Sequence, residues 1–195
     1  MNRITEIIKE SIYTKEKILS NEILLRKIEE SSKIITKAFS NKNSVYFCGN
    51  GGSAADAQHL VAEFLIRLKP HINRNGIPAL TLAQDVSTIT ACSNDYDFNL
   101  LYARNLETLG LKKDILIAIS TSGNSKNIYE VLKKSKKMGI YSIGLYGNNG
   151  GICKKMTNNS IIIKSSITSH IQEAHITIGH FIFGEVENLL LKKKW

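Results

Sequence analysis

The amino-acid sequence predicts an α/β protein, a three-layer αβα sandwich around a five-stranded parallel sheet preceded by two N-terminal helices. Short runs of β-branched and aromatic residues alternate with helical patterns, and each run ends in a Gly, Ser or Asn loop that opens a helix. This alternation is typical of βαβ units, in which helices cover both faces of a parallel sheet. The 195 residues, 43% of them hydrophobic, suffice for one core. We expect one domain over residues 1–195, with the two helices in 1–40 and the αβα core in 44–195.

The elements follow from the spacing of the apolar residues. Segments 2–18 and 20–40 carry isoleucines and leucines at helical spacing and predict the two N-terminal helices. Five short apolar runs predict the strands: Val45–Cys48, Ala79–Leu82, Ile115–Ile119, Tyr141–Leu145 and Ser160–Ile163. A last long helix is expected over about 170–192. Ligands of such sheets bind outside the carboxyl ends of the strands, so the loops at these ends are the expected site.

Charge and composition exclude several classes of protein. The net charge of +9 raises the possibility of a nucleic-acid partner, but the lysines are scattered on helix-like segments without a zinc-finger, RRM or basic-zipper pattern. No apolar stretch approaches the roughly 18 residues of a membrane span, and the N-terminus has no signal-peptide pattern. The three cysteines form no CxxC pair, so we expect them to be buried fillers. We expect a cytoplasmic protein that binds neither nucleic acid nor membrane.

A glycine-rich loop follows the first predicted strand. Its sequence, Gly49-Asn50-Gly51-Gly52-Ser53-Ala54, satisfies the G-x-G-x-x-G/A pattern of dinucleotide sites. Such a site also needs an acidic residue about 20 residues further on, whereas Asp85 is 36 residues past Gly49. A dinucleotide is therefore disfavoured. The glycines are equally typical of a tight turn that packs a helix close to the sheet, but Asn50 adds a donor and an acceptor that such a turn does not need.

A second loop, Ser120-Thr121-Ser122-Gly123-Asn124-Ser125, follows the third predicted strand and opens a helix. Free backbone N–H groups, the positive end of the helix dipole and four hydroxyl groups together suit a phosphate. The loop lacks the lysine of a GxxxxGK[ST] motif, so a nucleoside triphosphate is disfavoured. An ordinary serine cap is the simpler interpretation, but the density of hydroxyl groups favours a phosphate monoester on a small polar molecule.

Histidines and carboxylates gather on two predicted helices. His59 and Glu63 are four residues apart and share a helix face, while Gln172, Glu173, His175 and His180 lie early in the last helix. These residue types can hold a divalent metal ion such as Zn²⁺, or they can supply two acid/base groups across a substrate. A lone His/Glu pair is more often a surface pair. Spacing alone leaves the choice between His175 and His180 open.

With these residues the sequence resembles the sugar isomerase (SIS) domain family and, within it, the phosphoheptose isomerases. The matching stretches are Cys48-GNGGSAADAQH-Leu60 with Glu63, Asn94-Asp95, Ile119-STSGNS, and Ile171-QEAH with His180. They occur in family order from about residue 44 to the end, and the two N-terminal helices also fit. The resemblance implies the flavodoxin-like SIS fold.

The resemblance also implies roles for individual residues. The sugar chain would contact Asn50, Gly51, Gly52, Ser53, Asn94 and Asp95, and the phosphate would contact Ser120, Thr121, Ser122 and Ser125. One zinc ion per subunit would be held by His59, Glu63, Gln172 and His180. Glu63 and His180 would be the catalytic acid/base pair, with Glu63 and Gln172 also touching substrate. His175 is then left to helix packing or indirect support of the site.

The activity implied by the resemblance is an aldose–ketose isomerisation. Sedoheptulose 7-phosphate would become D-glycero-D-manno-heptose 7-phosphate through a cis-enediol, as the first step toward a nucleotide-activated heptose for bacterial surface polysaccharide. Family members are homotetramers with active sites at subunit contacts, and we expect the same here with the isoleucine-rich N-terminal helices as the assembly surface.

Two alternatives accompany this interpretation. One is a non-catalytic SIS-domain binding protein that associates with a replication initiator or senses phosphosugars, but initiator-binding relatives lack the counterparts of Glu63 and His180. The other is an isomerase of a different sugar phosphate. The chain departs from the family at Ser169-His170, where an arginine usually occupies the second position. We hypothesise that His170 still contacts the substrate or a neighbouring subunit.

Overall fold

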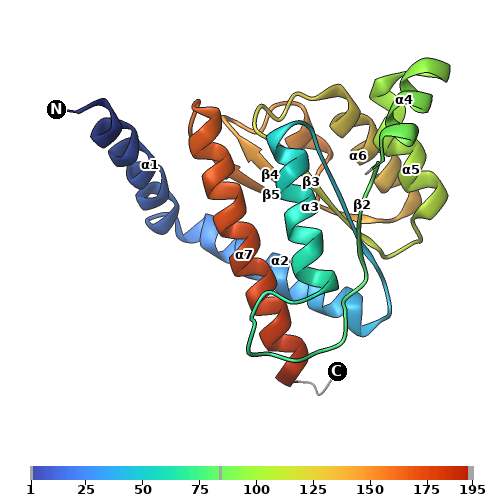
Figure 1. The fold of residues 1–195 in the computed structure, drawn as a ribbon, viewed down its shortest axis with the longest axis horizontal. Helices are drawn as coiled ribbons and strands as arrows, with labels where there is room; N and C mark the ends of the chain where they lie inside the picture. The colour runs from blue at the N-terminus through green and yellow to red at the C-terminus, as the bar shows by residue number, and fades with distance from the viewer. Residues whose placement is uncertain (1, 84, 193–195) are drawn as a thin grey trace.

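The computed structural model describes residues 2–83 and 85–192 and contains one parallel sheet between two layers of helices (Figure 1). Its strand order is β2-β1-β3-β4-β5. The strands are β1 (Val45–Gly49), β2 (Ala79–Thr81), β3 (Ile115–Ser120), β4 (Tyr141–Gly147) and β5 (Asn159–Ile163). The helices are α1 (Arg3–Leu19), α2 (Glu22–Ser40), α3 (Gly52–Leu65), α4 (Val86–Asp95), α5 (Leu101–Leu109), α6 (Lys126–Met138) and α7 (Thr168–Lys192), with short 3₁₀ helices at Phe98–Leu100 and Cys153–Met156. The predicted fold class is therefore confirmed.

The strands divide the core into two halves by the alternation of their side chains. Val45 and Phe47 pack with α2, α3 and α7, whereas Tyr46 and Cys48 pack with α5 and α6. Because both faces are covered, the inner strands are buried along their whole length, as in the pattern of β3. This explains why the strands show as continuous apolar runs in the sequence.

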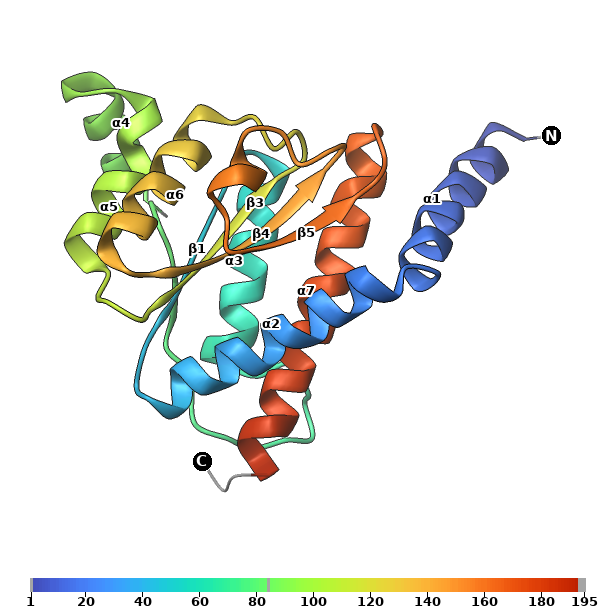
Figure 2. The ribbon, with the colours of Figure 1, turned by 180° about the vertical axis from the view of Figure 1, so that it is seen from behind.

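The two N-terminal helices begin at asparagine caps, since Asn2 and Asn21 each accept a hydrogen bond from a backbone N–H in the first turn. Helix α2 packs against α7 and β5, but α1 extends away from the sheet (Figure 2). Along α1, Ile4, Ile7, Ile8 and Ile12 are 48–59% exposed. A single chain therefore leaves an apolar surface on α1 uncovered.

The sequence placed the ends of the strands within two residues of their observed positions. The connection from β4 to β5 differs from the expected pattern, because a 3₁₀ helix rather than an α-helix lies between them. The segment is too short for an α-helix that returns along the strand. All three cysteines are free and buried, as expected. No helix within the described residues is long and apolar enough to cross a membrane.

Candidate active site

The glycine loop and the serine loop lie next to each other because the strand order reverses between β1 and β3. The chain goes from β1 outward to β2 and then returns to the other side of β1, and the register pairs Gly49 with Ile119. Both loops therefore leave the sheet at neighbouring carboxyl ends, which is where open α/β sheets bind ligands. The predicted location of the site is thus the topological switch point.

Close packing explains two glycines of the first loop. A Cβ atom at Gly49 would lie 2.4 Å from the carbonyl oxygen of Ser53, so this glycine lets α3 approach the strand. A Cβ atom at Gly52 would lie 2.2 Å from Nε2 of Gln172. The structure therefore brings Gln172 of α7 directly against the start of α3. Ser53 is buried in the first turn of α3.

Asn50 links the two loops through a residue that the sequence did not reveal as part of the site. Its amide nitrogen donates to Oδ1 of Asn127 over 2.9 Å, and Nδ2 of Asn127 donates back to Oδ1 of Asn50 over 2.8 Å. The hydroxyl of Tyr102 also donates to Asn50 and to the carbonyl of Gly49. This mutual pairing holds the first turn of α6 against the glycine loop. No local motif marks Asn127 or Tyr102, since both act over long sequence separations.

The serine loop forms a small hydroxyl network at the N-terminus of α6. Ser120 Oγ lies 3.0 Å from Ser125 Oγ and 3.5 Å from Ser122 Oγ, and it accepts a hydrogen bond from the N–H of Gly123. Ser125 is the N-cap residue, yet its side chain makes no capping hydrogen bond to α6. The N–H of Ile128 donates to Oδ1 of Asn127 over 2.9 Å, whereas the N–H groups of Lys126 and Asn127 have no acceptor among the described residues and suit an anion. Thr121, half-buried, continues the loop.

A second turn supports the serine loop from behind. Gly123 has a φ of +65°, and a Cβ atom there would lie 2.3 Å from the carbonyl group of Gly150. The side chain of Asn124 accepts a hydrogen bond from the N–H of Ile152. The turn after β4 therefore fixes the shape of the proposed phosphate loop, which the sequence alone did not indicate.

His59, Glu63 and His180 converge from α3 and α7. Nε2 of His59 lies 2.8 Å from Nε2 of His180 and 3.5 Å from Oε1 of Glu63. One potential ligand atom from each residue lies within 4.8 Å of the others. The Glu63 side chain is 18% exposed, while that of His59 is 47% exposed, so the group is reachable from solvent on the histidine side. The structure thus brings together three of the four predicted metal ligands and both predicted catalytic residues.

This donor set fits a divalent transition metal ion. Two imidazole nitrogens and one carboxylate oxygen are the ligands that catalytic zinc sites commonly use, with a further position left open. Among the described His, Cys, Asp and Glu residues, this is also the group whose ligand atoms converge closely enough to hold an ion. Gln172, the fourth predicted ligand, lies two turns earlier on α7 with its amide at Gly52.

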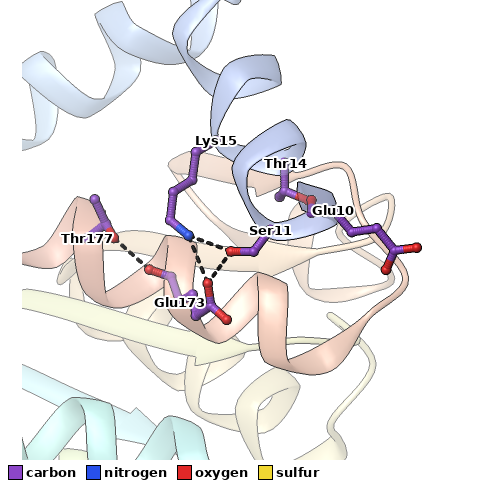
Figure 3. Close-up of polar contacts among 6 residues, drawn as sticks. All are labelled: Glu10, Ser11, Thr14, Lys15, Glu173 and Thr177. Carbon is purple, nitrogen blue, oxygen red and sulfur yellow. Dashed lines mark hydrogen bonds and ion pairs between the residues drawn. The ribbon is translucent and has the colours of Figure 1, made fainter. Parts of the chain in front are cut away.

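Glu173, which is adjacent to Gln172, faces away from this group. Its carboxylate accepts hydrogen bonds from the hydroxyl of Ser11 and from Nζ of Lys15, the latter at 2.8 Å (Figure 3). The basic partner lowers the pKa of Glu173, and the side chain stays charged at neutral pH. Glu173 therefore holds α1 to α7 and does not act as a ligand of the His59/Glu63/His180 group. His170, one turn earlier, is buried, and its ring also lowers the pKa of Glu173.

Asn94 and Asp95 lie exposed at the end of α4, where the Asn94 amide donates to the carboxylate of Asp95 over 2.8 Å. Helix α4 packs mainly against α5 and the 3₁₀ helix before it. The single chain therefore does not bring this pair into contact with the His59/Glu63/His180 group.

His175 is fully buried in α7, which agrees with the packing role expected for it. Burial lowers the pKa of His175 from 6.5 to about 4, although the backbone of Tyr146 opposes part of this shift. The ring is thus neutral at physiological pH and is not an acid/base group of the site. The choice of His180 over His175 agrees with the geometry.

The buried ring of His175 should make the stability of the protein pH-dependent. Between pH 6.5 and about 4 the unfolded chain takes up a proton that the folded chain refuses, so stability falls as the pH drops through this window. The loss should reach about 3 kcal/mol at its lower end. His175→Leu should remove this component, and urea unfolding of metal-free protein at pH 7 and pH 5 measures it. If the free energy of unfolding fell equally between pH 7 and pH 5 in the variant and the wild type, His175 would not be the source of this pH dependence.

Comparison with known proteins identifies the family. The sequence profile of the SIS domain matches residues 7–147, so the chain belongs to the SIS domain family. It is 45% identical to Phosphoheptose isomerase 2 of Campylobacter jejuni, over 94% of this chain and 90% of that protein. It is 43% identical to the phosphoheptose isomerase of Aneurinibacillus thermoaerophilus, over 96% of this chain and 94% of that one. Among solved structures, the phosphoheptose isomerase GmhA of Neisseria gonorrhoeae superposes with a TM-score of 0.88 at 31% identity, covering 95% of this chain and 97% of that one.

Proposed function

We propose that the chain is an aldose–ketose isomerase that converts sedoheptulose 7-phosphate to D-glycero-D-manno-heptose 7-phosphate. The observation that carries the proposal is the convergence of Glu63 and His180 from α3 and α7, and the serine loop, which is suited to a phosphate, supports it. The similarity to curated phosphoheptose isomerases over nearly the full chain supports this choice of substrate. In the cytoplasm such a reaction would be the first step toward a nucleotide-activated heptose for surface polysaccharide.

The chemistry needs two groups that move protons. A proton must leave C1 of the ketose and another must arrive at C2, while the carbonyl oxygen gains negative charge on the way to a cis-enediol. The Glu63 carboxylate is suited to accept the proton from carbon, and the His180 imidazole is suited to exchange a proton with the oxygens. The two groups come from separate helices and offer atoms within 4.8 Å of each other, so both can reach neighbouring atoms of one substrate.

The serine loop would hold the phosphate at the far end of the substrate. Hydroxyl groups of Ser120, Ser122 and Ser125, the adjacent Thr121 and the N-terminus of α6 offer neutral donors to a dianion. This binding is remote from the reacting carbons, so its contribution is to position the sugar. Asn50, Gly51, Gly52 and Ser53 would contact the sugar chain between the two ends.

His59, Glu63, Gln172 and His180 would hold one Zn²⁺ ion. When bound, such an ion would stabilise negative charge on the substrate oxygens. Glu63 cannot offer both oxygens to an ion and also act as a base. Oε1 is the oxygen that faces His59, so we assign Oε1 to the ligand group and Oε2 to proton transfer.

The active enzyme is proposed to be a homotetramer with its active sites at subunit interfaces. The uncovered isoleucines of α1 and the position of Asn94 and Asp95 away from the other site residues both support an incomplete single-chain site. Light scattering after size-exclusion chromatography tests the assembly directly, and a stable monomer with full activity would contradict it.

The function is tested by following sedoheptulose 7-phosphate by NMR with the purified, zinc-supplied protein. We expect appearance of the aldose signals and exchange of the C1 and C2 protons with solvent deuterium, because the proton passes through a titrating group. A chelator should abolish turnover and zinc should restore it. Binding of the substrate without any turnover would instead favour the non-catalytic alternative, and turnover of another sugar phosphate alone would change the substrate.

A further inference from the structure

The loop between α3 and β2 carries an arginine whose side chain is almost completely buried. The side chain of Arg74 is 5% exposed, and its Nε donates to Oε1 of Glu187 on α7 over 2.7 Å. The Glu187 side chain is 1% exposed. Its second oxygen has no hydrogen-bond partner among the described residues, so Arg74 balances the charge of this carboxylate.

The same guanidinium group caps the end of the helix that carries Glu63. Its NH2 nitrogen donates to the carbonyl oxygen of Glu63 over 2.7 Å, and NH1 donates to the carbonyl oxygen of Phe64 over 2.9 Å. These carbonyls belong to the last turn of α3, where no intrahelical partner is available. A planar fork with several N–H donors can serve two carbonyls and a carboxylate at once, which an ammonium group cannot do.

Neighbouring residues of the loop complete this cap. The N–H of Ile77 donates to the carbonyl of Phe64 over 3.0 Å, and a Cβ atom at Gly76 would lie 2.7 Å from the carbonyl oxygen of Leu65. The loop therefore closes directly over the end of α3. Arg74 reaches beyond this cap to α7, the helix that also carries His180.

We infer that Arg74 is a positioning residue, which with Glu187 fixes the backbone of Glu63 relative to His180. The inference rests on the proposed roles of Glu63 and His180. One guanidinium connects the carbonyl of the proposed base to the helix of its partner, and Glu187 lies two turns beyond His180. Because proton transfer depends on sub-ångström placement of the reacting groups, loosening this connection should lower kcat more than it affects substrate binding.

The test replaces both members of the pair, since removing one alone would leave a buried unpaired charge that could unfold the chain. The double variant Arg74→Met with Glu187→Met should fold, with a Tm lowered by the loss of the hydrogen bond to the carbonyl of Glu63 but without an unpaired buried charge. Its kcat for sedoheptulose 7-phosphate should fall at least about tenfold with KM changed less than about twofold. Its Kd for Zn²⁺, measured by competition with a chromophoric chelator, should rise. Arg74→Lys, which retains the charge facing Glu187, should recover part of the lost kcat.

The matched control is Lys69→Met. Lys69 also lies in the loop between α3 and β2, and its Nζ donates to Oδ1 of Asn188 on α7 over 2.6 Å. Unlike Arg74, it donates to no carbonyl of α3 among the described residues. Its removal should leave kcat and the Kd for zinc unchanged. A folded double variant with wild-type kcat and zinc affinity would overturn the inference, as would an equal loss in Lys69→Met. If the wild type binds zinc but does not isomerise the sugar, the proposed function fails, and the zinc affinities alone decide the role of Arg74.

Discussion

Glu63→Gln should lower kcat for sedoheptulose 7-phosphate by about 10³-fold, because a positioned general base contributes about 10² to 10⁴ to such a rate. The substitution keeps the size of the side chain and its capacity for hydrogen bonds, so the half-buried position should tolerate it. What it removes is the carboxylate that can accept a proton from carbon. Steady-state kinetics by a coupled or NMR assay measures the effect, and circular dichroism checks the fold.

The control separates loss of the base from loss of a metal ligand. His59→Asn weakens the ligand group but retains the Glu63 carboxylate, so excess zinc should restore much of its activity. Excess zinc should not restore Glu63→Gln. Glu107→Gln removes an exposed carboxylate that pairs with Lys134 and should leave kcat unchanged. If Glu63→Gln kept more than about a tenth of wild-type kcat, Glu63 would not be the base.

The fold could be predicted almost completely from the sequence, because its information is local. Each strand is a short apolar run that both faces of the sheet bury, as in Ile115–Ser120, and each helix shows the periodicity of its buried face. The connection between β4 and β5 contains a 3₁₀ helix where the sequence pattern predicts an α-helix, because the segment is too short for one.

The candidate site could be predicted only where it is marked by a motif. The glycine loop, the serine loop and the His59/Glu63 spacing are local patterns. The structure brings the two loops together at the carboxyl ends of β1 and β3, whereas His59 and Glu63 lie further along α3, next to His180. Tyr102 and Asn127 act on Asn50 from 52 and 77 residues away. Arg74 joins the end of α3, 10 and 11 residues away, to Glu187, 113 residues away, and no local motif reveals any of these contacts. Their hydrogen bonds nevertheless determine how the marked residues are held. Motifs therefore indicate which residues react, whereas only the packed chain shows what positions them.

The net charge of +9 does not arise from the proposed phosphate site. The proposed phosphate loop consists of hydroxyl and backbone N–H donors, so its affinity does not require the lysines. Several of these lysines pair with surface carboxylates, as Lys134 does with Glu107 and Lys133 with Glu130. Their remaining contribution is a long-range attraction of anionic substrates, which salt should weaken.

Gly123→Ala should destabilise the protein by about 3 kcal/mol, which combines backbone strain with a steric clash. Gly123 has a φ of +65°, which a residue with a Cβ atom adopts at a cost of about 1 to 2 kcal/mol. The new Cβ atom would also lie 2.3 Å from backbone atoms of Gly150, which cannot rotate away as a flexible side chain would. The turn after β4 must therefore move, and the serine loop that it supports moves with it. Urea unfolding measures the loss of stability, and KM for the phosphorylated substrate should rise about tenfold.

Gly51→Ala provides the comparison, because it introduces backbone strain without a steric clash of the added Cβ atom. Gly51 has a similar φ of +57°, but no atom lies within 4 Å of the position that its Cβ would take. It should lose only backbone strain, about 1 to 3 kcal/mol, because its ψ of −124° lies outside the left-handed helical region. A rise in KM for Gly123→Ala beyond that for Gly51→Ala then reports the contact between Gly123 and the Gly150 turn. An equal KM in both variants would mean that this turn yields freely, and that the serine loop keeps its shape through its own hydroxyl network.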